Sequence, residues 1–144
     1  MGPWLLIAPE FRIDSLWASR SDIKDITGLE YCTSLKSLSL DCNLITDLSP
    51  LAGLTNLETL WLYDNRIADI SPLAGLTNLK YLSLNDNQIA GISPLAGLTN
   101  LENLWLHDNE ISDISPLALL TAEIIYFKMN TPQLAAVGMV TKPT

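Results

Sequence analysis

The nonapeptide SPLAGLTNL occurs three times without change, at 49–57, 71–79 and 93–101. The copies are evenly spaced, and the surrounding chain can be cut into successive blocks with a period of about 22 residues and almost no adjustment. Such a unit is too short to bury its own apolar side, but stacked units can share one continuous core. The period therefore predicts a solenoid of stacked repeats.

Each block carries the spacing L-x-x-L-x-L-x-x-N-x-I, as in Leu57, Leu60, Leu62, Asn65 and Ile67. The alternation around the leucines predicts a short strand with its leucines buried and their neighbours pointing outward. At the turn out of each strand we expect an asparagine ladder whose amides pair with buried backbone groups. Its members are Asn43, Asn65, Asn87 and Asn109.

The segment SPLAGL predicts a short turn or 3-10 segment on the other side of the solenoid. Ser71 is a candidate cap of this segment, and Pro72 is compatible with its first residue. Asp47, Asp69 and Asp113 precede the serines by two positions and have the character of turn and capping residues.

On these residues the chain resembles the leucine-rich repeats, specifically the 22-residue class of bacterial internalin-like proteins. The resemblance covers roughly residues 13–130. It implies an α/β repeat solenoid, a horseshoe with a parallel β-sheet on the concave face and turns or short 3-10 segments on the convex face. It also implies a module for adhesion or recognition, at the cell surface or secreted if the chain is a fragment of such a protein.

We expect one domain over 1–144, with an N-terminal cap (1–12), about five repeats (13–122) and a degenerate last strand with a C-terminal cap (123–144). Ile124, Phe127 and Met129 are expected at leucine positions, which predicts a last strand near 126–130. The tail is weakly polar for a cap, so an open sheet edge there could pair with a second copy to form a homodimer.

The middle outward column of the predicted sheet alternates tryptophan and serine: Trp17, Ser39, Trp61, Ser83 and Trp105. Because parallel strands lie about 4.8 Å apart, successive tryptophans should be about 9.6 Å apart, with ring-width slots above the serines. Tyr63, Tyr81 and His107 are expected to rim these slots.

Tryptophan and tyrosine are typical anchors of protein interfaces, and a contiguous aromatic stripe on one face favours binding. We therefore predict a non-catalytic module that binds a protein partner through the concave face. Trp17, Trp61 and Trp105 would be the anchors, with Tyr63, Tyr81 and His107 as supporting contacts.

Two other interpretations remain open at this stage. The large rings could simply shield the sheet in a structural spacer or a consensus-like engineered scaffold without a ligand of its own. Alternatively, sugar rings could stack in the tryptophan slots.

Charge and hydropathy exclude several classes of partner. The net charge is −8, with 16 acidic and 8 basic residues, so the chain lacks the basic face that nucleic acids and anionic membranes require. No stretch is long and apolar enough to span a bilayer. The apolar segment 4–9 lacks the basic flank and cleavage site of a signal peptide.

The remaining chemistry is sparse. Asp64, Asp86 and Asp108 form a row of carboxylates, but no second ligand set accompanies them, so we expect solvated turn acids and neither metal nor cofactor. A Ser83–His107–Asp86 triad would be diagonal, about 7–8 Å between serine and histidine, and no nucleophile turn accompanies it. The sequence therefore predicts that the protein is not an enzyme.

The two cysteines, Cys32 and Cys42, are not expected to pair. Cys32 lies at a core leucine position, and Cys42 lies on the row of Asp64, near the opposite end of the strand.

Overall fold

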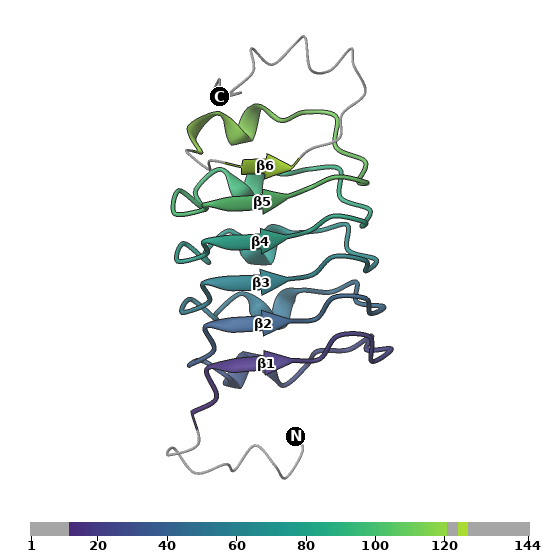
Figure 1. Ribbon diagram of the computed structural model, residues 1–144, viewed down its shortest axis with the longest axis vertical. Coiled ribbons are helices and arrows are strands. Elements are labelled where there is room, and N and C mark those ends of the chain that lie inside the picture. The colour runs from purple at the N-terminus through teal and green to yellow at the C-terminus, as the bar shows by residue number, and fades with distance from the viewer. Residues whose placement is uncertain (1–11, 121–123, 127–144) are drawn as a thin grey trace.

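The structure is a computed structural model that describes residues 12–120 and the backbone of 124–126. Its strands form one six-stranded parallel sheet in chain order, stacked along the long axis of the molecule (Figure 1). The strands are β1 (Ser15–Trp17), β2 (Ser37–Ser39), β3 (Thr59–Trp61), β4 (Tyr81–Ser83), β5 (Asn103–Trp105) and β6 (Ile124–Tyr126). The predicted fold class is confirmed.

Within the described residues, five 3-10 segments return the chain behind the sheet. They are η2 (Leu29–Tyr31), η3 (Ser49–Leu51), η4 (Ser71–Leu73), η5 (Ser93–Leu95) and η6 (Ser115–Leu119). We call this side of the solenoid the turn side and the outward surface of β1–β5 the sheet face. Among the described residues, no helix is long and apolar enough to cross a membrane.

The repeat places the same leucine at the centre of successive strands. Leu38, Leu60, Leu82 and Leu104 are paired across the sheet and fully buried. The 3-10 segments contribute Leu51, Leu73 and Leu95 to the same core, which runs continuously through the stack. Burial of apolar area between neighbouring repeats is the main stabilising contribution to such a fold.

The starts of the 3-10 segments differ from the expectation in one respect, the role of the serine. Ser71 is the first residue of η4 and makes no cap through its side chain. Asp69 takes this role, because its Oδ1 accepts a hydrogen bond from the Ser71 backbone N–H at 2.9 Å. Asp47 and Asp113 accept equivalent hydrogen bonds from the Ser49 and Ser115 backbone N–H groups, so the three acids are turn and capping residues as predicted.

The last strand is displaced from its predicted position. β6 comprises Ile124–Tyr126 rather than residues near 126–130, and Ile125 pairs with Leu104. This pairing makes the last repeat one position shorter than the repeat that joins Leu82 to Leu104. The 3-10 segment η6 continues to Leu119, two residues further than the corresponding segments η3 to η5, and Leu120 is extended. Apart from residue 12 and β6, the expected caps at 1–12 and 123–144 lie outside the described residues.

Candidate recognition face

The middle column of the sheet face has the register that the repeat predicts. Trp17 pairs with Ser39, Ser39 with Trp61, Trp61 with Ser83, and Ser83 with Trp105. Trp17 is 67% exposed, whereas the other two tryptophans are half-buried. Ser39 and Ser83 are buried beneath this surface.

The tryptophan rings do not stand apart as expected. The ring centroids of Trp61 and Trp105 are 5.4 Å apart with an interplanar angle of 39°, in place of the predicted separation of about 9.6 Å. Strand spacing fixes only where the backbones lie, and two large rings bury more apolar area by leaning together. The predicted slot above Ser83, which is 2% exposed, is therefore closed.

Tyr63 joins a polar cluster at and just beyond the ends of β1 and β2, where it contacts Asp41. Its hydroxyl donates to the Asp41 carboxylate. This hydrogen bond is the main cause, and burial the second, of a Tyr63 pKa that is raised to about 12. Asp41 also accepts hydrogen bonds from Ser39 and from Ser19, the latter at 2.8 Å. Burial raises the pKa of Asp41, but these hydrogen bonds outweigh it and hold the pKa below its ordinary value. The cluster is a structural feature whose polar groups satisfy one another.

Tyr81 belongs to the column at the start of the strands. Its hydroxyl donates to Glu102 Oε2 at 2.9 Å, a hydrogen bond that raises the pKa of Tyr81. Beside it, Lys80 Nζ forms an ion pair with Glu58 Oε2 at 2.9 Å. As a whole residue, Tyr81 remains 36% exposed.

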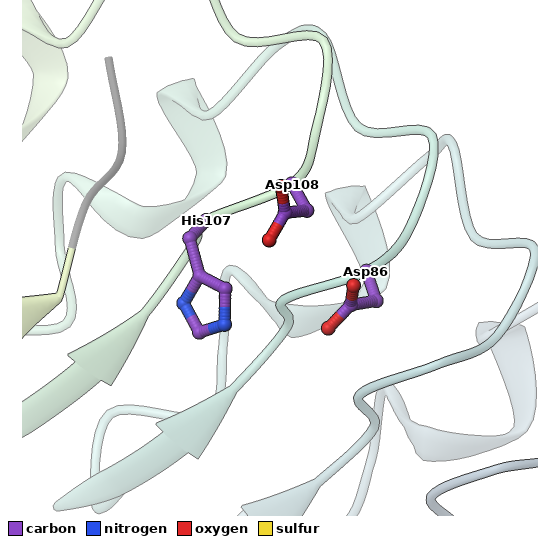
Figure 2. A group of neighbouring side chains, drawn as sticks. All are labelled: Asp86, His107 and Asp108. Carbon is purple, nitrogen blue, oxygen red and sulfur yellow. The ribbon is translucent and has the colours of Figure 1, made fainter.

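His107 lies next to two carboxylates that the sequence assigned only as turn acids. One ligand atom from each of Asp86, His107 and Asp108 lies within 4.8 Å of the others (Figure 2). Ser83 Oγ donates to Asn85 Oδ1 at 2.7 Å, and Asn85 Nδ2 in turn donates to Asp86 Oδ2 at 2.7 Å. Ser83 is thus engaged with Asn85, and the geometry does not assemble a Ser83–His107–Asp86 triad.

The asparagine ladder holds the turns that follow the strands. The Asn65 amide donates to the carbonyl oxygens of Leu40 and Leu62, and its Oδ1 accepts from the Ile45 backbone N–H at 3.0 Å. Asn43, Asn87 and Asn109 bond the backbone of their own and the preceding turn in the same way. These bonds satisfy polar groups that would otherwise be buried without partners.

Each ladder turn has one residue in the left-handed region. Cys42, Asp64, Asp86 and Asp108 have φ values of 54° to 55°. Aspartate tolerates this conformation better than most residues, so the backbone of these turns explains why Asp64, Asp86 and Asp108 recur there.

The turn side carries a second ladder that the sequence analysis did not predict. Asn56, Asn78 and Asn100 donate from Nδ2 to the carbonyl oxygens of Thr33, Thr55 and Thr77. The signal was present, because these asparagines occupy one position of the repeated SPLAGLTNL segment. Both cysteines are free thiols and half-buried.

Comparison with known proteins agrees with this geometry. The family profile described as "Leucine Rich repeats (2 copies)" matches residues 12–53, 55–89 and 77–119. The chain therefore belongs to the leucine-rich-repeat family, and its solved neighbours assign it to the bacterial internalin-like class. A comparison with curated protein sequences gives no significant match.

Two of the similar solved structures are internalins from Listeria monocytogenes. Internalin C2 is 45% identical with a TM-score of 0.77, over 81% of this chain and 52% of its own. Internalin inlF is 37% identical with a TM-score of 0.76, over 87% of this chain and 38% of its own. This chain thus spans about half or less of the internalin chains it matches.

A plant protein shares the fold alone. The leucine-rich-repeat ectodomain of the receptor kinase SOBIR1 from Arabidopsis thaliana is 23% identical with a TM-score of 0.66. The alignment covers 81% of this chain and 70% of the ectodomain chain.

Proposed function

We propose that this chain is a non-catalytic recognition module that binds a protein partner through its sheet face. The observation that carries the proposal is Trp17, which is 67% exposed on a strand of an otherwise well-packed solenoid. Large apolar side chains that remain exposed on a regular surface favour a binding role, and tryptophan is enriched among residues that anchor interfaces.

The other aromatic residues extend this surface in a defined shape. Trp61 and Trp105 contact each other, so they offer a partner one rigid aromatic platform. A surface that is already ordered loses little conformational entropy on binding. Tyr81 adds a partly exposed ring near the other end of the strands.

Charge defines the kind of protein that would fit. Asp64, Asp86 and Asp108 line the end of the sheet face, and all three are exposed on a chain of net charge −8. A complementary partner would present arginine or lysine side chains, which pair with carboxylates and stack on tryptophan rings.

The test uses serine, because Ser39 and Ser83 already occupy this column. We would compare Trp17→Ser and the Trp61→Ser, Trp105→Ser double variant with wild type. The matched control is Leu119→Ser, which changes a residue that is 77% exposed on the turn side. Each protein would be used to capture partners and to probe a glycan panel, with thermal melting curves measured in parallel.

If the module binds protein, Trp17→Ser loses the captured partner at an unchanged melting temperature, while Leu119→Ser retains it. Capture of a glycan by wild type would instead support carbohydrate binding. Failure of wild type to bind anything, with a lower melting temperature for the double variant, would support the structural-spacer interpretation.

Two further parts of the proposal concern context. We place the protein at the cell surface or among secreted proteins by analogy with its internalin-like class, and fractionation of cells that express the gene tests this. A homodimer through residues 123–144 stays a prediction, and sedimentation equilibrium of the full chain measures it.

A further inference from the structure

We propose that Asp86, His107 and Asp108 form a binding site for a divalent transition-metal ion of the Zn²⁺ or Ni²⁺ type. Figure 2 shows the imidazole and the two carboxylates turned towards the same gap, from the ends of two neighbouring strands. A ligand atom from each side chain lies within 4.8 Å of the other two. Metal–ligand bonds of about 2.0–2.2 Å place adjacent ligand atoms about 3–3.5 Å apart, so small side-chain rotations complete the site.

The donor set determines which ions fit. One imidazole nitrogen and two carboxylate oxygens suit zinc and nickel, for which imidazole is a preferred ligand. Calcium and magnesium require more oxygen ligands than this site offers, and they gain little from an imidazole. The remaining coordination positions would be filled by water, since both aspartates are exposed.

The backbone that carries these side chains is fixed by the fold. The Asp86 N–H donates to the carbonyl oxygen of His107 at 3.0 Å, and the Asn87 N–H donates to that of Asp108 at 3.2 Å. On the next turn, the Asn109 amide donates to the carbonyl oxygens of Leu84 and Leu106. Ion binding therefore needs only side-chain rotation, and rigid support of this kind favours a defined site.

The repeat supplies a comparison within the same chain. At the position of His107, the preceding repeat has Asn85, so Asp64, Asn85 and Asp86 repeat the arrangement without an imidazole ligand. Among residues 12–120, no other three metal-ligating side chains lie as close together. The proposed site is thus specific to one pair of turns.

The test is a titration of the untagged 144-residue chain with zinc chloride. Binding is followed by calorimetry and by the NMR resonances of the imidazole, which is unambiguous because the chain has one histidine. We expect one saturable site per chain and a shift of the His107 ring resonances, which calcium chloride at the same concentration does not cause.

Four variants make the assignment specific. His107→Asn introduces the residue of the preceding repeat and should abolish binding. Asp86→Asn and Asp108→Asn should each weaken it about tenfold or more, because even residues that only support a metal ligand cost that much. Asp64→Asn, on the same row with the same backbone conformation, should leave binding unchanged.

Asparagine tolerates the left-handed region, so the aspartate variants should fold, and circular dichroism melting curves check this. Zinc binding with equal affinity to His107→Asn, unmoved imidazole resonances in wild type, or chemical-shift changes centred on Cys42 would each overturn the proposal. Loss of binding in Asp64→Asn to the same extent as in Asp86→Asn would overturn it as well, since it would indicate a general response to acidic charge.

Discussion

The third and first repeats have strands of the same length but very different surroundings. In β3, Leu60 is fully buried and its two neighbours are half-buried. In β1, Leu16 is only half-buried, and Ser15 and Trp17 are exposed. β3 lies between two strands, whereas β1 pairs with β2 alone among the strands described. A repeat of this length is therefore stabilised mainly by its neighbours.

The two repeats also differ in local sequence. The ladder position is Asn65 in the third repeat and Ser21 in the first. The first repeat has two non-glycine residues in the left-handed region, Arg20 and Asp22, where the third has only Asp64. Its 3-10 segment follows Gly28 at φ 109°, a conformation that glycine adopts at little cost.

The largest expected effect tests burial directly. Leu60→Ala should lower the free energy of unfolding by about 3–5 kcal/mol, because it leaves a cavity among fully buried side chains. Leu16→Ala should cost roughly half of that or less, since its site is already partly open. Urea unfolding of both variants, with Leu82→Ala as a second central position, measures the difference. Equal losses at Leu16 and Leu60 would contradict the comparison.

A smaller effect is expected at the ladder position. Asn65→Ala leaves buried carbonyl groups and the Ile45 N–H without partners and should cost about 3 kcal/mol. Ser21→Ala removes one exposed hydrogen bond, from Ser21 Oγ to the Ser19 carbonyl oxygen, and should cost less than about 1 kcal/mol. Hydrogen exchange of the Ile45 amide reports whether the ladder bond itself was lost. A Ser21→Ala variant as unstable as Asn65→Ala would show that the first repeat depends on this position equally.

The smallest effect concerns a capping acid that the first repeat has and the fourth lacks. Asp25 accepts a hydrogen bond from the Thr27 N–H, as Asp69 does from Ser71, but the fourth repeat has Gly91 at this position. A Cβ at Gly91 meets nothing within 4 Å. Gly91→Ala should therefore gain about 0.5 kcal/mol by restricting the unfolded chain, and Gly91→Asp should gain more by capping Ser93.

Measurements at low pH separate the capping contribution of Gly91→Asp from the gain that comes from restricting the unfolded chain. Hydrogen bonds from the Ser71 backbone and hydroxyl lower the pKa of Asp69 from 3.8, and the same kind of bonds lower the pKa values of Asp47 and Asp113. A lowered folded-state pKa contributes stability above the unfolded value, which is lost as pH falls through the folded value. The advantage of Gly91→Asp over Gly91→Ala in urea unfolding curves should thus begin to shrink as pH falls towards about 3.8 and should vanish once pH falls below the lowered folded-state pKa. A difference that persists in acid would mean that the introduced carboxylate does not cap Ser93.

Most of the fold could be predicted from the sequence because each repeat shows the same core positions again. Leu60, Leu82 and Leu104 occupy one position, and a register that departs from the repeat period would expose them all. The register of the last repeat was predicted wrongly. Ile124, Phe127 and Met129 fit the leucine spacing of the repeat as well as the register with Ile125 opposite Leu104 does. Nothing local in that segment distinguishes a shortened repeat from a lengthened one.

The candidate recognition face was predictable as a set of columns but not as a set of contacts. The period placed Trp61 and Trp105 two strands apart, with Ser83 between them. It did not predict that their rings meet, that Tyr63 bonds Asp41, or that His107 faces Asp86 and Asp108. These long side chains have several rotamers each, and neighbours on other strands select among them.

The period, the leucine core, the sheet register of β1–β5 and the outward columns were thus all readable from the chain alone. Each follows from apolar residues that must be buried at one spacing along the chain. Which outward side chains touch was settled by the folded stack, because those contacts run across the sheet between positions about one or two repeats apart. The contact between the Trp61 and Trp105 rings and the Asp86–His107–Asp108 group were both decided by the tertiary structure.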